Sequence, residues 1–215
     1  MTTEIDHVIV AVADLRDAAE WWRTTTGLGV STGGRHPGGT ENLCIPLGGT
    51  QYLELITVFD RSNPDAADWI RFIDSGGGLS SWAVKTDDVP GCAARTASPI
   101  VEGWSERSDG SRGGGWVTVG SAGAFQSHGE LPFFIEYATD NSVTWAQGYT
   151  VAKHRRQPAG IAEIVIGGDP ARLNAWVGDA DLPVRLQPGA TGLVSVTIAM
   201  LDGDPVTFPI PSETP

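Results

Sequence analysis

Three strand-like segments each carry one side chain capable of acid–base or metal chemistry. The segment "IDHVIVAV" contains His7, "QYLELITVF" contains Glu54 and "LPFFIEYA" contains Glu136. Because strand side chains alternate between two faces, each of these residues shares a face with apolar neighbours. A carboxylate in that setting is costly to bury unless it is paired, hydrogen-bonded or bound to a metal. An imidazole and two carboxylates that converge would suit Zn, Ni, Mn, Fe or Mg, and a glutamate could also act as a general base.

Each of these residues also has a purely structural interpretation. A histidine in a buried strand can be a core side chain that is hydrogen-bonded to the backbone or to Glu54. Glu54 and Glu136 could lie at the edges of a cleft, where water solvates them. The chemical interpretation gains weight because the three residues occupy comparable places in segments that resemble one another.

The first sixty residues contain the elements of one βαβββ unit. Asp14 follows the first strand and is a suitable N-cap for a helix. That helix has one apolar face, formed at helical spacing by Leu15, Ala18, Ala19 and Trp22. Gly27 and Gly29 end it. The expected strands lie at 5–12, near 30, at 43–48 and at 51–59.

The pattern of this unit recurs twice along the chain. Residues 79–97 repeat the strand, the acidic N-cap and the alanine-rich helix, with Asp88 in the place of Asp14. A third, shorter copy begins at residues 160–178, with Asp169 as its N-cap. Copies spaced about 75–80 residues apart indicate an internal duplication.

The repeats predict the fold class and the domain organisation. A single βαβββ unit exposes one face of its sheet, whereas two paired units enclose a shared cleft. We therefore predict an α+β fold in which repeated βαβββ modules pair into a cup-shaped mixed sheet, with a third partial module at the C-terminal end. The predicted two-module domain spans 1–138, with modules at about 4–60 and 79–138. A connecting segment follows at 139–159, and the third module occupies 160–215.

The glycine-rich stretch "GGRHPGGTEN", residues 33–42, is predicted to be a loop beside the cleft. Its glycines let the backbone approach a ligand, and Arg35, His36, Thr40 and Asn42 offer polar groups for substrate binding. A turn that only connects two strands is the alternative. No GKS or GKT follows and the stretch opens no helix, so we expect no nucleotide cofactor.

Composition excludes several classes of partner. The formal net charge of -12 disfavours binding to nucleic acid. Two cysteines without metal-type spacing suit a reducing compartment, and "MTTEIDHV" lacks the pattern of a secretory signal. No apolar run approaches the roughly 20 residues that a membrane span needs. We expect a cytoplasmic protein without membrane contact, as a monomer or a homodimer, that binds a small molecule.

Four segments together resemble a known superfamily. "IDHVIVAVADL", "GGRHPGGTEN", "YLELI" and "LPFFIEY" are similar to glyoxalase-like members of the vicinal oxygen chelate superfamily. That superfamily also contains lactoylglutathione lyase, extradiol dioxygenases, fosfomycin-modifying enzymes and bleomycin-sequestering proteins. The similarity covers about residues 4–136 and extends more loosely into the third copy.

The resemblance implies a metal site, with one departure. Carried over position by position, it assigns His7, Glu54 and Glu136 as metal ligands on the first and last strands of each module. The fourth position, often a histidine in metal-dependent members, is Ser81 when Asp14 is aligned with Asp88. Serine is a poor ligand for a divalent ion, and His128 in "FQSHGELP" is the alternative ligand that the chain offers.

Two main functions are compatible with this resemblance. In the first, the protein is a lyase or isomerase that binds a substrate through vicinal oxygens and uses Glu54 or Glu136 as general base, with or without a divalent metal. In the second, it is a non-catalytic protein with the same cup that binds a cationic or aromatic compound, for example an antibiotic. A scaffold role, with the third module as an interface, is a further alternative.

Overall fold

The computed structural model describes residues 3–107, 109–138 and 148–208. Its first part contains one βαβββ unit. The elements are β1 (Glu4–Ala11), α1 (Leu15–Trp21), the π-helical turn η1 (Trp22–Thr26), β2 (Ser31–Arg35), β3 (Thr40–Gly48) and β4 (Gln51–Val58).

The second unit adds helices between its strands. Its elements are η2 (Pro64–Ala66), α2 (Ala67–Asp74), β5 (Gly78–Lys85), α3 (Val89–Thr96), β6 (Ile100–Glu106), β7 (Arg112–Val119), α4 (Ser121–Gln126) and β8 (Phe133–Tyr137). The last part contains β9 (Pro158–Gly167), α6 (Pro170–Val177), β10 (Val184–Leu186), β11 (Gly192–Met200) and β12 (Val206–Phe208).

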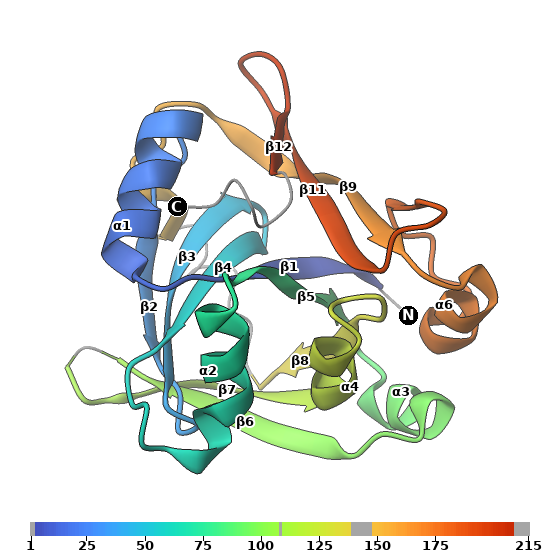
Figure 1. Ribbon diagram of the computed structural model, residues 1–215. Coiled ribbons are helices and arrows are strands. Elements are labelled where there is room, and N and C mark those ends of the chain that lie inside the picture. Colours follow the sequence, from blue (N-terminus) through green and yellow to red (C-terminus); the bar gives the residue numbers. More distant parts are fainter. Residues whose placement is uncertain (1–2, 108, 139–147, 209–215) are drawn as a thin grey trace.

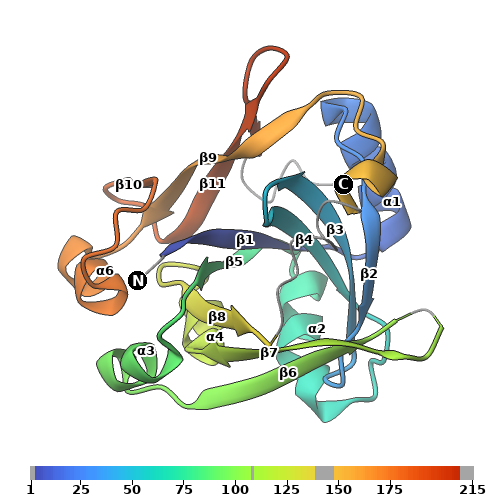
Figure 2. The ribbon, with the colours of Figure 1, turned by 180° about the vertical axis from the view of Figure 1, so that it is seen from behind.

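The strands form a closed barrel and a separate smaller sheet. The barrel order is β1-β4-β3-β2-β6-β7-β8-β5, and the smaller sheet has the order β10-β9-β11-β12. Within the barrel, β1 is antiparallel to β5, whereas β1–β4 and β5–β8 are parallel pairs. The two halves are therefore related by an approximate twofold axis between β1 and β5 (Figures 1 and 2). The predicted α+β fold of paired βαβββ modules is confirmed.

In each repeated unit, an aspartate begins the helix that follows the first strand. Asp14 accepts hydrogen bonds from the backbone N–H groups of Arg16 and Asp17, and Asp88 accepts one from that of Gly91. Asp169 caps α6 in the same way. These side chains satisfy N–H groups that have no partner inside the helix. The N-cap predictions are confirmed.

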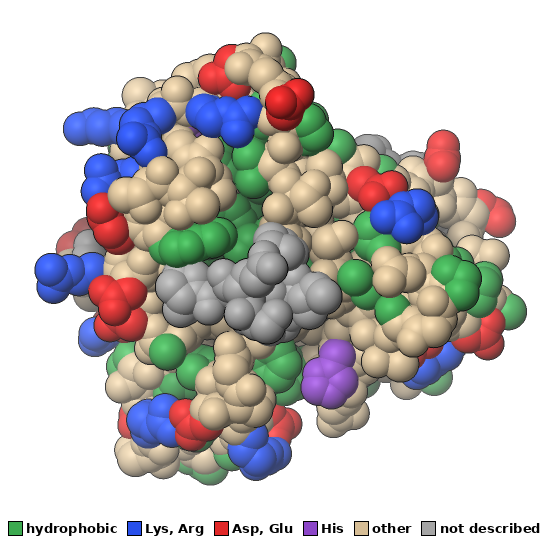
Figure 3. Space-filling model, turned by 45° about the horizontal axis from the view of Figure 1, so that its top comes forward, with side chains coloured by type: hydrophobic (Ala, Val, Ile, Leu, Met, Phe, Trp, Pro, Cys, Tyr) green, Lys and Arg blue, Asp and Glu red, His purple; other side chains and the backbone are tan. Residues whose placement is uncertain are grey.

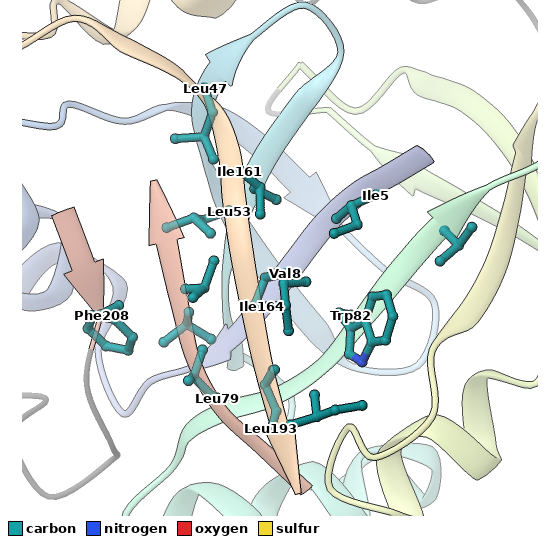
Figure 4. Packing of buried hydrophobic residues seen from close by; sticks show 14 of the residues in the cluster. Ile5, Val8, Leu47, Leu53, Leu79, Trp82, Ile161, Ile164, Leu193 and Phe208 are labelled. Carbon is teal, nitrogen blue, oxygen red and sulfur yellow. The ribbon is translucent and has the colours of Figure 1, made fainter. Parts of the chain in front are cut away.

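The smaller sheet covers the outer face of the barrel strands β1 and β5. Ile161 and Ile164 of β9 and Leu193 of β11 pack against Val8 and Trp82 (Figure 4). At the other end of this contact, Phe208 of β12 stacks on a tryptophan of η1. The outer core thus consists of apolar side chains, and the polar strand residues face the other way.

The structure corrects the prediction for residues 33–42. The glycine-rich stretch is mostly strand, because β2 continues to Arg35 and β3 begins at Thr40. The turn between them is short, with Gly39 in the left-handed region at a φ of 83°. The helices α2 and α4 were not predicted, and both lie at one side of the barrel (Figures 1 and 2).

Charged side chains of both signs occupy the surface. On the face shown in Figure 3, basic and acidic groups lie interspersed around the edges. Within the described residues, no helix is long and apolar enough to cross a membrane.

Candidate active site

A cavity of about 760 Å³ lies against the inner face of the barrel. Its size falls in the range of roughly 300–1,000 Å³ typical of small-molecule sites. Strands of both halves line it, and Trp69 of α2 and Ser121 of α4 contribute from the side. The cavity is therefore built by the paired modules together.

Both halves contribute polar and apolar side chains to the cavity. Strands β1, β3 and β4 supply the polar groups of His7, Thr40, Asn42, Cys44, Tyr52 and Glu54. The second half supplies the apolar side chains Trp69, Trp116, Phe133 and Ile135 together with the polar side chains Arg107, Thr118 and Tyr137. Glycines and short polar side chains line part of the boundary, namely Gly33, Gly34, Ser105, Gly113 and Gly114.

Strand pairing places His7 and Glu54 on the same wall. His7 is opposite Tyr52 in the parallel β1–β4 pair, and Glu54 is opposite Ile9, two residues further along. Residues two apart on a strand share a face, so both side chains point into the barrel. His7 is 2 % exposed and Glu54 is 7 % exposed. The predicted alternation in these two strands thus gives the correct face.

Three ionisable side chains lie in a row. His7 Nδ1 lies 2.6 Å from Asp6 Oδ1, and His7 Nε2 lies 3.6 Å from Glu54 Oε2. The first distance is a short charge-assisted hydrogen bond, and the second is too long for one. His7 Nε2 and Glu54 Oε2 are therefore close to each other but are not hydrogen-bonded.

Asn42 holds the other oxygen of Glu54. The backbone N–H of Gly34 donates to Asn42 Oδ1 at 2.7 Å, so the amide nitrogen must face the opposite way. Asn42 Nδ2 donates to Glu54 Oε1 at 2.6 Å and lies 3.5 Å from His36 Nε2. His36 Nδ1 in turn lies 2.8 Å from Thr40 Oγ1. This chain fixes the orientation of the carboxylate.

Burial keeps the neighbouring phenols and thiol protonated. Burial raises the pKa of Tyr137 well above its usual value, and the nearby Asp6 carboxylate raises it further. Burial is also the main cause of the raised pKa of Tyr52, and burial followed by the charge of Glu54 raises the pKa of the Cys44 thiol. Tyr52 and Tyr137 are therefore neutral hydroxyl groups in this site, and their oxygens lie 3.2 Å apart.

Comparison with known proteins assigns the family. A family model described as "Glyoxalase-like domain" matches residues 5–180. The chain belongs to the glyoxalase-like domain family. Its relationship to the vicinal oxygen chelate superfamily, which the sequence segments indicated, is confirmed. A search of curated proteins gives no match.

Several solved structures are similar to this glyoxalase-like chain. A hypothetical protein from Staphylococcus aureus is 15% identical, with a TM-score of 0.65 over 91% of this chain and 90% of that one. Methylmalonyl-CoA epimerase from Mycobacterium tuberculosis is 21% identical, with a TM-score of 0.43 over 62% and 86% of the two chains. A Streptomyces coelicolor methylmalonyl-CoA epimerase variant, in complex with 2-nitronate-propionyl-CoA, is 20% identical, with a TM-score of 0.46 over 66% and 98%.

The structure corrects the position of Glu136. It does not line the cavity, whereas Ile135 and Tyr137 on either side of it do. The sequence alignment matched Glu136 with Glu54, but Phe133, Ile135 and Tyr137 are the β8 residues that line the cavity, so Glu136 lies on the opposite face of the strand. A shift of one residue moves a side chain to the opposite face of a strand.

Two further predicted residues lie outside the cavity lining. Arg35 points away from the cavity, pairs with Glu41 at 3.0 Å and lies over the Phe59 ring. His128 is an exposed turn residue, with a φ of 50°. Ser81 of β5 is buried and pairs with Ile9 of β1. The other three predicted substrate-binding residues line the cavity, namely His36, Thr40 and Asn42.

The donor set does not fit a divalent metal. Among the residues that the structure describes, no group of three or more His, Cys, Asp and Glu side chains is arranged to hold one. From the second half, β8 supplies Phe133, Ile135 and Tyr137 to the cavity, none of which carries a carboxylate or an imidazole. Metal sites usually take three or four protein ligands. The structure thus does not bring His7, Glu54, Glu136 and His128 together.

Sequence reasoning missed Asp6, Tyr137 and Trp69. Strict alternation assigned Asp6 to the opposite face from His7, yet its carboxylate contacts the histidine and the Tyr137 hydroxyl. Tyr137 is the residue after Glu136, so the same register error hid it. The Asp6–His7 dipeptide was the available signal, because two adjacent ionisable residues in an apolar strand are expensive to bury separately.

Proposed function

We propose that this glyoxalase-like protein is an enzyme that moves a proton on a small molecule carrying adjacent oxygens. The observation that carries the proposal is the pair of buried atoms Glu54 Oε2 and His7 Nε2, which lie 3.6 Å apart on the wall of the cavity. The other oxygen of Glu54 is already held by Asn42. A base fixed by one oxygen and open at the other is suited to proton abstraction.

The reaction needs no additional reactant. Glu54 Oε2 removes a proton from the carbon next to a carbonyl group, and the C–H electron pair moves to form an enolate. The carboxyl proton passes to His7 Nε2, which regenerates the carboxylate. Return of the proton from His7 to the adjacent carbon, with transfer of the substrate hydroxyl proton to the former carbonyl oxygen, gives an isomer. Expulsion of a leaving group, which takes the proton from His7, gives the product of a lyase. His36, Thr40 and Asn42 bind the substrate oxygens.

Solvent exchange tests this function without knowledge of the natural substrate. The probes are dihydroxyacetone, hydroxyacetone and glycolaldehyde, each of which has a C–H group beside a carbonyl and an adjacent oxygen. Incubation with the protein in D₂O is expected to exchange this proton faster than buffer, as followed by ¹H NMR. Glu54→Gln should slow the exchange by about 10²–10⁴-fold.

Glu136→Gln is the matched control, because Glu136 lies on the outer face of its strand. It should leave exchange unchanged. The proposal is wrong if none of the three probes exchanges above the protein-free rate, or if the two glutamine variants behave alike. Exchange that is lost on treatment with a chelator would contradict the metal-free step.

Non-catalytic binding is the second candidate function. The aromatic side chains Trp69, Trp116 and Phe133 favour it, because they offer a flat apolar surface to an aromatic compound. Tryptophan fluorescence quenching by a probe that shows no proton exchange would support binding over catalysis.

A further inference from the structure

The backbone of β1 has an irregular register at Asp6. Ile5 is opposite Val84 of β5, but His7 is opposite Ala83, so Asp6 is an extra residue in the pairing. A bulge of this kind re-aims the side chains that follow it. Ile5 consequently packs in the outer core while His7 lines the cavity.

The Asp6 carboxylate is fully buried, and only one of its two oxygens has hydrogen-bond partners within the described residues. Its Oδ1 atom lies 2.6 Å from His7 Nδ1 and accepts a hydrogen bond from the Tyr137 hydroxyl at 2.8 Å. Its Oδ2 atom is buried and has no hydrogen-bond partner within the described part of the chain. The residue is 0% exposed. An arrangement that leaves one carboxylate oxygen unpaired is costly, so the bonds at the other oxygen must be strong.

Aromatic rings hold the remaining sides of the His7 imidazole. The Tyr52 ring stacks on it with a centroid distance of 4.5 Å and an interplanar angle of 22°. The Phe133 ring meets it edge-on at 5.5 Å. The Nδ1 edge faces Asp6 and the Nε2 edge faces Glu54. The ring is therefore fixed in one orientation by residues from both halves of the barrel.

We infer that Asp6 is a positioning residue whose carboxylate, anchored by the Tyr137 hydroxyl, holds His7 in the tautomer with its proton on Nδ1. The Nε2 lone pair then faces Glu54 and can take the proton that Glu54 removes. The role of this tautomer in catalysis rests on the proposed function. The tautomer itself is a property of the free protein, so it can be measured without a substrate.

Nitrogen NMR of the unmodified protein gives the first test. Long-range ¹H–¹⁵N spectra of ¹⁵N-labelled protein, recorded above neutral pH, distinguish a protonated ring nitrogen from an unprotonated one. The His7 signals are assigned by their absence in His7→Gln. We expect a protonated Nδ1 and an unprotonated Nε2. A proton on Nε2 with none on Nδ1, or protons on both nitrogens at every pH at which the protein is folded, would overturn the inference.

Asp6→Asn gives the second test, and its direction follows from the unpaired oxygen. The asparagine NH₂ group should take the Oδ1 position, because only there do both of its protons find acceptors, His7 Nδ1 and the Tyr137 oxygen. His7 Nδ1 must then accept a hydrogen bond, and the ring proton should move to Nε2. An unchanged tautomer in this variant contradicts the inference.

Tyr137→Phe is the matched control. It also disturbs the bonding of Asp6, but it keeps the carboxylate, so the proton should stay on Nδ1. A reversed tautomer in this variant would mean that packing, and not the carboxylate, sets the ring. The inference and the proposed function fail separately, since the proton-exchange assay with Glu54→Gln does not depend on the tautomer of His7.

Discussion

Two oxygen atoms of one residue have different environments in the candidate active site. Glu54 Oε1 accepts the Asn42 amide hydrogen bond at 2.6 Å, whereas Oε2 points toward His7. Asn42 can only donate there, because the Gly34 N–H fixes its oxygen on the other side. The close backbone approach requires a glycine at position 33, where an added Cβ would lie 2.0 Å from Asn42 Oδ1. The conformation of the carboxylate thus depends on the glycine-rich stretch.

Asn42→Asp should be strongly destabilising at neutral pH. The substitution places a second carboxylate against Glu54 Oε1, and two carboxylates at that distance cannot both ionise. We expect a loss of about 1–3 kcal/mol in the free energy of unfolding, measured by urea denaturation at pH 7. Asn174→Asp, at an exposed position of α6, is the control and should have little effect. Equal losses in the two variants would contradict the assigned hydrogen bond.

The free energy of unfolding should fall at alkaline pH, because two tyrosines are buried in the folded protein. Burial raises the pKa of Tyr52 and Tyr137 well above 10.0, their value in the unfolded chain. Their contribution to stability is therefore complete below pH 10 and is lost as the pH rises through the folded-state values. Once both are ionised in the unfolded chain only, the free energy of unfolding should fall by about 2.7 kcal/mol per pH unit.

Denaturation curves recorded between pH 9 and pH 11.5 measure this slope. Tyr52→Phe should lower the slope by about 1.4 kcal/mol per pH unit. The Cys44 thiol, whose pKa is raised by burial and then by Glu54, adds a contribution of about the same size that begins near pH 9. A slope that is unaffected by Tyr52→Phe would show that this tyrosine ionises in the folded protein.

At the scale of the elements, strand register decides which residues reach the cavity. Alternation along β1 and β4 was sufficient to predict that His7 and Glu54 point inward. The position of Glu136 depended on how β8 aligns with β4, and short apolar strands such as "YLEL" and "FIEY" match in more than one register. The extra residue at Asp6 arises from pairing with β5 and has no local signature.

The helices show the same division between local and tertiary signals. Aspartate N-caps marked α1, α3 and α6, because capping is a property of adjacent residues. The helix α2, which brings Trp69 to the cavity, was missed although Asn63 and Pro64 form a suitable start for the turn before it. The predicted domain boundaries remain predictions, and residues 139–147 of the connecting segment lie outside the described residues.

Phe208→Ala should weaken the packing of the smaller sheet against η1 and so lower the free energy of unfolding. Phe208 of β12 is 1% exposed and stacks on Trp22 with a centroid distance of 4.7 Å. Removal of a buried phenyl ring typically costs about 3–5 kcal/mol, which chemical denaturation would measure. The control is Phe59→Ala, since Phe59 is 41% exposed and should lose less than about 1 kcal/mol. A similar effect of both substitutions would mean that the sheet contributes little to this contact.

At the scale of the whole molecule, the barrel is closed unevenly. The β1–β5 pairing runs from Glu4 opposite Lys85 to Ala11 opposite Gly78. On the other side, the register of β2 and β6 contains, among the described residues, the single pair Arg35 and Glu106. The smaller sheet lies over the β1–β5 side of the barrel, as Figure 1 shows. Opening of the barrel should therefore start between β2 and β6.

Hydrogen exchange followed by mass spectrometry tests this expectation. Peptides from β2 and β6 should exchange well before those from β1 and β5, because local opening exposes the least paired strands first. A dihydroxyacetone concentration that saturates the cavity should slow exchange in β2 more than in β9, which lies outside it. Equal exchange rates in all strands of the barrel would contradict the expectation that β2 and β6 separate first.

The two residues that we propose for proton transfer and several apolar side chains of the cavity come from different halves of the barrel. His7 and Glu54 come from the first half, and Trp116 and Ile135 come from the second. A mutant library restricted to positions 116 and 135 would therefore reshape the space for a ligand and leave His7 and Glu54 in place. Selection for new compounds could thus act on one half of the sequence alone.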